Sequence, residues 1–429
     1  MVIKNIFFKF SSFFRDHKKL IVLLAIFVAH IFFRFYLLEE RMGFNWDQVD
    51  NAWAAKDIIV DNKFPLQGMI AKLNSGFYIG PLYYYFIAVF YWIFNLNPIA
   101  SAFSAGFTSI VTYFVLFYIV KKLFSYKIAL IVVFIHTVSF FIISSDRAQW
   151  PVNFIVPISA IIFYSLYNVL IGKIKYLILL GIGLGISFHL HFTSIFYLII
   201  ILLSLPFFPR KKETMKYFFL SIIIFLLFLS PIMFSELTSG NKGSNSFIQY
   251  YQTYYHGFHL TRVFQLTHDA FIEFELILKG WFRDLNYIFL FVFFIIYFLL
   301  KPSRKKFIMC YLMSLWFIVP WFVFATYKGE ISNYYFFLNR PIALIIIAYI
   351  SFYLFNLRTI LPKIIIVGFW VYFCSVNINE FINENRSDYG ENKRKTLEAI
   401  DKGEIIKPYQ NIPESYLYYY YTRDNKNKK

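Results

Sequence analysis

Two aspartates stand three residues apart in the segment FNWDQVDNAW, which covers residues 44–53. Asn45 can cap a helix that begins here, because Gln48, three positions further on, can hydrogen-bond back to it. In such a helix Asp47 and Asp50 share one face, and a carboxylate held in this way can act as a general base toward a hydroxyl group. A second interpretation needs no catalysis, since acids near a helix N-terminus also stabilise the helix dipole.

Several arginines could bind an anionic group such as a phosphate, for which a planar guanidinium is well suited. Arg147 and the nearby Asn153 belong to the polar segment SSDRAQWPVN, which we expect on the same side of the membrane as the aspartates. Arg340 stands inside the apolar run FFLNRPIAL, so it either faces a cavity and binds phosphate or extends toward the interface. Arg34, near the end of the first apolar run, has the same two interpretations. Arg262 belongs to an aromatic stretch that forms either a lid over the substrate or a solvated amphipathic loop.

Two pairs of histidines raise the question of a metal. His189 and His191, in FHLHFTS, are two residues apart and do not share a helical face, which disfavours joint metal ligation. They could instead hydrogen-bond to a phosphate or a sugar, or cap a helix hairpin. His256 and His259 have helical spacing, but no third ligand is set by spacing, so a zinc site is disfavoured. The sequence predicts no cofactor with certainty and leaves a divalent metal open.

The elements that carry these residues are membrane helices. Of 429 residues, 59% are hydrophobic and 15% are charged, which is a membrane composition. Several apolar runs reach the roughly 20 residues that a helix needs to cross the hydrocarbon core. We therefore predict an all-α fold, a polytopic transmembrane helical bundle. The formal charge of +18 does not indicate nucleic acid, because the basic residues form short clusters where helices would leave the membrane.

Eleven segments are predicted to span the bilayer. They are residues 20–38, 99–120, 128–143, 152–171, 176–190, 192–208, 217–233, 284–300, 307–325, 334–355 and 364–379. A twelfth run, IGPLYYYFIAVFYWIF at 79–94, has 16 residues, about 24 Å of helix against a core of about 30 Å. If this run does not cross, the lysine-rich segments all lie on one side and hold 20 of the 42 basic residues. The positive-inside rule then makes that side and the N-terminus cytoplasmic.

This topology defines two parts. Residues 1–379 form the transmembrane module, with long non-cytoplasmic loops at 39–98 and 234–283. The run 79–94 becomes an interfacial or re-entrant helix of the first loop, and its aromatic residues, Tyr83 among them, are suited to line a groove. Residues 380–429 form a small polar tail on the non-cytoplasmic side, either an appended element or partly disordered.

Four segments together resemble a known family. They are FNWDQVDNAWAAKDII, GPLYYYFIAVF, DRAQWPVNFIVP and GIGLGISFHLHFTS, all within about the first 235 residues. The pattern resembles the GT-C glycosyltransferase superfamily, in the bacterial branch related to protein O-mannosyltransferases and the lipid A aminoarabinose transferase.

The resemblance implies a cell-membrane enzyme of the cell envelope that takes a sugar from a polyprenyl-phosphate donor on the non-cytoplasmic face. The acceptor is a hydroxyl of a glycan, lipid or protein. Asp47 falls on the family's aspartate, the base of an inverting transfer, with Asp50 as its partner. Gln48 stands where the family carries a glutamate, which removes one candidate for acceptor or metal binding. Asn153 lies near a later family acid.

Two alternatives share this composition. A transporter or flippase of lipid-linked saccharides would need no base, and a structural membrane subunit would need no cavity. The resemblance favours the enzyme, with substrate-binding candidates at Arg147, Asn153, His189, His191, Arg262, Arg340 and Tyr83.

Overall fold

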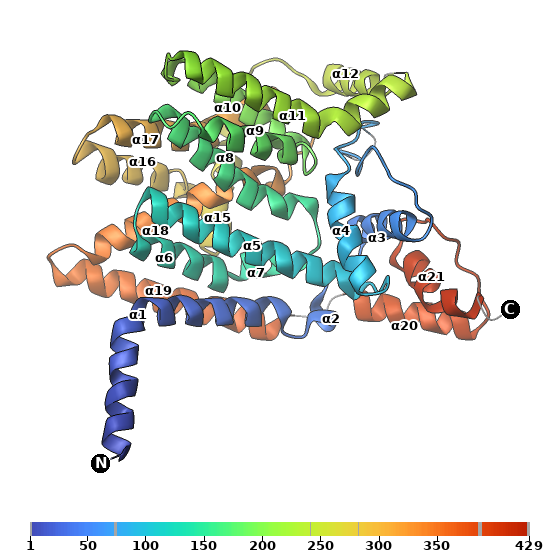
Figure 1. The fold of residues 1–429 in the computed structure, drawn as a ribbon, viewed down its shortest axis with the longest axis horizontal. Coiled ribbons are helices and arrows are strands. Elements are labelled where there is room, and N and C mark those ends of the chain that lie inside the picture. The colour runs from blue at the N-terminus through green and yellow to red at the C-terminus, as the bar shows by residue number, and fades with distance from the viewer. Residues whose placement is uncertain (1, 73–74, 241, 282, 385–387, 427–429) are drawn as a thin grey trace.

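The protein is almost entirely helical in the computed structural model, which describes residues 2–72, 75–240, 242–281, 283–384 and 388–426 (Figure 1). Within these ranges no strand is present, only two isolated bridges, between Ile70 and Tyr78 and between Tyr255 and Tyr327. The predicted all-α class is confirmed.

The helices of the bundle follow the apolar runs of the sequence. They are α1 (Val2–Phe35), α5 (Ile99–Leu123), α8 (Ile155–Leu170), α9 (Tyr176–Ser187), α10 (Ile195–Ser204), α11 (Lys212–Ser239), α17 (Arg304–Phe324), α18 (Arg340–Phe355) and α19 (Ile360–Asn383). Each of the eleven predicted spans falls on a helix or on consecutive helices. In the described part of the chain, six helices are long and apolar enough to cross a membrane, and α6 (Tyr126–Val138) with α7 (Phe140–Arg147) makes a seventh if the bent pair counts as one span. The full number of eleven stays a prediction.

The remaining elements complete the chain. They are α2 (Leu38–Arg41), α3 (Trp46–Ile59), α4 (Leu82–Ile93), α12 (Lys242–Tyr254), α13 (Leu260–Gln265), α14 (Thr267–Ala270), α15 (Ile272–Ile277), α16 (Ile288–Phe294), α20 (Asp388–Asp401), α21 (Pro413–Lys426), a π-helical turn at Ile295–Leu299, and 3-10 segments at Pro151–Phe154, Phe192–Ser194, Leu205–Phe207, Arg283–Leu285 and Asn333–Asn339.

The break between α6 and α7, a bend of 67°, is stabilised by side chains from other helices. Arg34 of α1 donates to the carbonyl oxygens of His136 and Thr137, at 2.6 and 2.7 Å, which a continuous helix would have used itself. The freed N–H of Phe140 donates to Asn377 Oδ1 at 2.7 Å. Because every buried backbone group needs a partner in a bilayer, these contacts make the break possible.

Helix α4 has a different direction from the bundle. Figure 1 shows α4 running across the ends of the long helices, at the end where α3, α20 and α21 also gather. This orientation favours the interfacial placement predicted for 79–94, although the side of the membrane stays a prediction.

The C-terminal tail, expected as an appended or partly disordered element, packs against α3 through α21 and against α2 through α20. Tyr409 stacks on Trp53 of α3 with ring centroids 4.3 Å apart. The buried Tyr416 donates a hydrogen bond to the carbonyl of Leu96 at 3.0 Å. The tail is therefore part of the assembly around α3.

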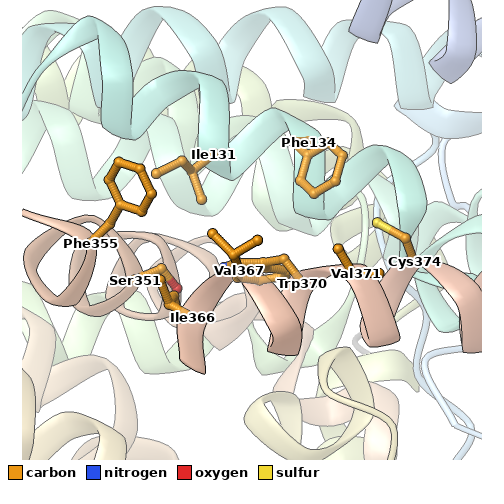
Figure 2. Close-up of a pocket in the computed structure, with 9 residues that line it drawn as sticks. All are labelled: Ile131, Phe134, Ser351, Phe355, Ile366, Val367, Trp370, Val371 and Cys374. Carbon is orange, nitrogen blue, oxygen red and sulfur yellow. The ribbon is translucent and has the colours of Figure 1, made fainter. Parts of the chain in front are cut away.

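A groove of about 520 Å³ lies between α6, α18 and α19 (Figure 2). Its lining is apolar except for Ser351, whose hydroxyl donates to the Ile347 carbonyl, and the Cys374 thiol. Its lining supplies no charged side chain that could act as an acid, a base or a phosphate-binding cation.

Candidate functional site

A cavity of about 600 Å³ lies at the end of the bundle where α3 and α4 meet the later loops. Its walls come from seven separate parts of the sequence. The lining residues are Trp46, Asp47, Asp50, Gly68, Met69, Ile70, Ala71, Lys72, Tyr78, Ile79, Tyr84, Trp150, Pro151, Val152, Leu190, His191, Glu330, Ser332, Tyr334, Tyr335 and Asn411.

Helix α3 presents its first turn to this cavity. The predicted capping box is present, since Gln48 Oε1 accepts a hydrogen bond from the Asn45 N–H at 2.8 Å. The amide nitrogen of Gln48 donates to the carbonyl of Gln149 at 2.6 Å. A glutamate could not make the second contact, because a carboxylate has no proton to donate. The neutral amide of Gln48 thus ties α3 to the segment after α7.

The two aspartates of α3 differ in their partners. Asp50 accepts a hydrogen bond from the Tyr84 hydroxyl at 2.5 Å. Within the described ranges, no group donates a hydrogen bond to the Asp47 carboxylate or pairs with it. Burial, together with the negative charge of Asp50, raises the pKa of Asp47 to about 6. Burial also raises the pKa of Asp50, and the hydrogen bond from Tyr84 opposes that effect. Asp47 is therefore free to accept a proton from a bound hydroxyl near neutral pH.

The sequence analysis missed Lys72, a basic residue in the cavity wall. Its ammonium group donates to the Tyr327 hydroxyl at 2.6 Å and to the Glu330 carbonyl at 3.0 Å. It also lies 5.0 Å from the ring centroid of Tyr327 and 5.7 Å from that of Tyr335. Among the lining residues no other lysine or arginine is present. Only its place in the first outer loop could have suggested it, and Lys63 shares that property.

His191 lines the cavity as predicted for a substrate-binding residue. Its Nδ1 lies 2.9 Å from the Thr193 hydroxyl. Burial and, secondly, the charge of Lys72 lower the pKa of His191 to about 3, so the imidazole is neutral. A neutral ring can donate or accept one hydrogen bond to a sugar hydroxyl.

His189 has a structural role instead. Its Nδ1 accepts from the Leu82 N–H at 3.2 Å and its Nε2 lies 2.9 Å from the Phe228 carbonyl. A Cβ at Gly80 would meet His189 Nδ1, so only glycine allows this close approach. His189 thus fixes the start of α4, a helix outside the hairpin that the capping alternative concerned.

Tyr83 and Asn153 are placed beside the cavity, not in its lining. The Tyr83 hydroxyl accepts from the Gln149 side chain at 3.1 Å. Its neighbour Tyr84 is the residue of α4 that contacts an aspartate. Asn153 donates to the carbonyls of Ser145 and Ala148, at 2.7 and 2.8 Å, and closes the turn that follows α7.

The predicted arginines are not brought into the cavity. Arg340 forms an ion pair with Glu273, at 2.8 Å, and both side chains are fully buried. A buried guanidinium needs a compensating charge, and Glu273 supplies it. Arg262 is half-buried, and its Nη1 lies 3.5 Å from Gln265 Oε1, outside the cavity lining.

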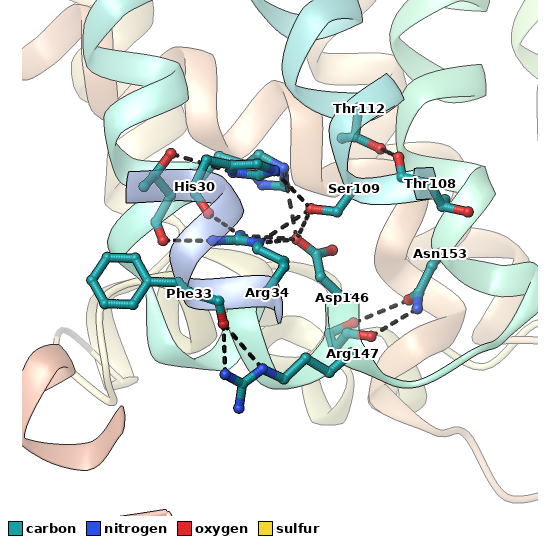
Figure 3. A network of polar contacts seen from close by, with 12 residues as sticks. His30, Phe33, Arg34, Thr108, Ser109, Thr112, Asp146, Arg147 and Asn153 are labelled. Atoms are coloured by element: carbon teal, nitrogen blue, oxygen red, sulfur yellow. Dashed lines mark hydrogen bonds and ion pairs between the residues drawn. The ribbon is translucent and has the colours of Figure 1, made fainter. Parts of the chain in front are cut away.

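Arg147 and Arg34 link helices in a buried network (Figure 3). Arg147 donates to the Phe33 carbonyl at 2.6 Å and pairs with Glu384 at 2.5 Å. Arg34 pairs with Asp146 at 2.9 Å. Each arginine caps the C-terminal end of a neighbouring helix, and neither belongs to the cavity lining.

The ranges that the structure describes contain no metal-binding cluster. In them, no three histidine, cysteine, aspartate or glutamate side chains are grouped so that they could hold an ion. His256 and His259 have ring centroids 4.9 Å apart, and His259 Nε2 lies 2.9 Å from the His256 carbonyl. That geometry is a local turn contact.

Comparison with known proteins gives a family-model match in one part of the chain and structural matches over most of it. Residues 79–234 match the family model of dolichyl-phosphate-mannose-protein mannosyltransferase. ArnT from Cupriavidus metallidurans, solved with undecaprenyl phosphate, superposes with a TM-score of 0.56 at 9% identity, over 94% of this chain and 74% of that one. This chain has the fold of ArnT, a GT-C glycosyltransferase. The resemblance predicted from the sequence is thereby confirmed.

A second GT-C structure is similar over most of this chain. It is the archaeal oligosaccharyltransferase AglB from Archaeoglobus fulgidus, in complex with an inhibitory peptide and a dolichol-phosphate. The TM-score is 0.56 at 11% identity, over 93% of this chain and 61% of AglB, so this chain spans less than two thirds of that protein. No curated protein matches the sequence at a significant level.

Proposed function

We propose that this chain is a membrane glycosyltransferase that moves a sugar from a polyprenyl-phosphate donor to an acceptor hydroxyl on the non-cytoplasmic face. One observation carries the proposal: a single cavity holds an unpaired carboxylate with a raised pKa, Asp47, and a lysine, Lys72. Similarity to GT-C structures solved with undecaprenyl phosphate and with dolichol-phosphate supports the substrate class.

The two residues divide the reaction between them. Asp47 takes the proton of the acceptor hydroxyl, whose oxygen then attacks C1 of the sugar from the face opposite the phosphate. The bond between C1 and the phosphate oxygen breaks, and its electron pair stays on the leaving polyprenyl phosphate. That group gains one negative charge, which the ammonium of Lys72 stabilises. Attack from the opposite face inverts the configuration at C1.

Asp50 and Tyr84 support the base. The charge of Asp50 raises the pKa of Asp47, and the Tyr84 hydroxyl holds Asp50 in place. The neutral His191 and the aromatic rings of Tyr334 and Trp150 form the wall against which a sugar would rest.

The test uses the full chain in lipid nanodiscs, a panel of undecaprenyl-phosphate-linked hexoses and pentoses as donors, and a total membrane extract as acceptor. Release of undecaprenyl phosphate measures transfer, and native mass spectrometry measures binding of undecaprenyl phosphate. Lys72→Met should weaken that binding at least tenfold, because a charge-assisted contact is lost. Lys63→Met is the matched control, since this exposed lysine of the same loop pairs with Asp61 outside the cavity.

Asp47→Asn should leave binding intact and abolish release. Wild-type release by Asp47→Asn would contradict the proposal. A flippase would move the donor between leaflets in these nanodiscs without releasing undecaprenyl phosphate from any donor.

A further inference from the structure

A second cavity with charged walls, of about 570 Å³, lies at the start of α11. Figure 1 shows α11 beginning at the end of the bundle opposite α3 and α4. Three consecutive basic residues, Arg210, Lys211 and Lys212, stand in its wall and are exposed. No described acidic side chain forms an ion pair with them, and the one acid beside them, Glu213, is not part of the lining.

A buried hydroxyl in this wall has no partner. Thr214 is 5% exposed, and within the described chain nothing donates to or accepts from its Oγ1. Thr214 lies in the first turn of α11, whose leading N–H groups lack intrahelical acceptors, and the Lys211 side chain gives no cap. A buried unpaired hydroxyl is costly, so its presence indicates a ligand with acceptor oxygens. Three cations, a helix N-terminus and this hydroxyl together suit a phosphate.

The rest of the wall is apolar. Phe208, Met215 and Phe218 contribute to it, with Leu205 and Pro206 from the preceding segment. Helix α11 packs on α9 along one face, but few of its residues are fully buried and it carries an apolar run, so this wall continues onto a surface suited to hydrocarbon. A small inorganic anion would leave the apolar part unused, whereas a lipid with a phosphate headgroup would occupy both parts.

We propose that this cavity is a binding site for an anionic phospholipid. The phosphodiester contacts Arg210, Lys211 and the Thr214 hydroxyl, and an acyl chain lies along Phe208 and Phe218. Because 210–216 is predicted to be cytoplasmic, the lipid belongs to the inner leaflet. The site does not depend on the proposed transferase activity, and it lies at the other end of the bundle from Asp47.

The experiment measures lipid binding by the full chain, purified in detergent, with dioleoyl-phosphatidylglycerol, dioleoyl-phosphatidylcholine, undecaprenyl phosphate and inorganic phosphate as separate probes. Native mass spectrometry gives the affinities, and the melting temperature should rise with the lipid that binds the folded state. We expect phosphatidylglycerol to bind at least tenfold more tightly than phosphatidylcholine. Millimolar inorganic phosphate should not displace it.

Two sets of variants locate the site. Arg210→Gln/Lys211→Gln should weaken phosphatidylglycerol binding at least tenfold. Lys173→Gln/Lys175→Gln, which removes two exposed lysines from the loop before α9, should leave it within twofold. Thr214→Val should weaken it about fivefold, and Thr214→Ser, which keeps the hydroxyl, should restore it.

Three outcomes would overturn the proposal. The first is equal loss of binding in both double variants, which would mean a general effect of surface charge. The second is displacement by inorganic phosphate, which would mean a simple anion site. The third is preference for undecaprenyl phosphate, which would assign the cavity to the carrier lipid.

Discussion

Acids that are buried or half-buried occur in two regions of this molecule and have opposite surroundings. Within the bundle, Asp146 pairs with Arg34 at 2.9 Å and Glu273 pairs with Arg340 at 2.8 Å. In the cavity, Asp47 has no cation and no hydrogen-bond donor among the described groups, and the nearest charge that acts on it is another acid, Asp50. Neutralised acids hold helices together, whereas an acid left unpaired beside a cavity keeps its ability to take a proton. The difference separates charges that link helices from the charge to which the proposed function assigns catalysis.

The largest expected effect comes from removing the unpaired charge. Asp47→Asn should lower transfer by about 10³-fold or more, because it removes the general base, and should leave the melting temperature unchanged or higher. Asp146→Asn should do the opposite and lower the melting temperature, since it leaves Arg34 buried without its partner. Transfer assays and thermal melts of both variants test the contrast. Loss of stability in Asp47→Asn would show that its carboxylate has a structural partner.

The second prediction concerns the buried ion pair between Glu273 and Arg340 when only the acid is replaced. Glu273→Gln should lower the free energy of unfolding by about 3–5 kcal/mol, because it leaves the Arg340 guanidinium uncompensated in an apolar surrounding. The double variant Arg340→Met/Glu273→Met should be less destabilised than Glu273→Gln. Unfolding in denaturing detergent measures both. If the double variant had a lower free energy of unfolding than Glu273→Gln, the buried ion pair would contribute net stability, contrary to the prediction.

The third prediction concerns pH. A base with a pKa of about 6 must be deprotonated to act, so transfer should fall as pH drops below about 6 and level off above it. The same raised pKa means that the folded state favours protonated Asp47, so stability should decrease as pH rises from about 4, the ordinary pKa, to about 6. Asp50→Asn removes the like charge and should shift the rate profile to lower pH. A profile that did not move would exclude coupling between the two acids.

The smallest expected effect concerns the support of Asp50. Tyr84→Phe removes the hydroxyl that donates to Asp50 and should lower transfer by a few fold, with donor binding unchanged. Tyr85→Phe is the matched control, because its hydroxyl donates to the Pro65 carbonyl and not to a cavity residue. Kinetics of both variants at one donor concentration suffice. Equal losses would assign the effect to α4 packing.

Local patterns predicted much of this arrangement. The helix at 46–59, its cap through Asn45 and Gln48, and the cavity positions of Asp47, Asp50 and His191 all follow from types and spacing of near neighbours. The position of Tyr83 shows the limit of such reasoning. A helix turns 100° per residue, so the choice between Tyr83 and Tyr84 depends on how α4 is rotated against α3, which no local pattern reports.

The arginines show the limit more clearly. Each of Arg34, Arg147 and Arg340 suited a phosphate by type, yet each has partners between 67 and 237 positions away in the chain. Lys72, which had no distinguishing pattern, is the cation that faces the cavity. A charge in an apolar setting takes whichever partner the fold brings near, and that choice depends on packing.

The sequence alone determined that this chain is a helical membrane protein, that α3 carries an acid pair, and that the chain resembles GT-C glycosyltransferases. These follow from hydrophobic runs, helix caps and short motifs, which act between near neighbours. Only the tertiary structure decided which charges are neutralised, that Lys72 joins Asp47 in one cavity, and that the C-terminal helices pack on α3. Those depend on contacts between segments far apart in the chain, whose energies are set by burial and by the distance between charges.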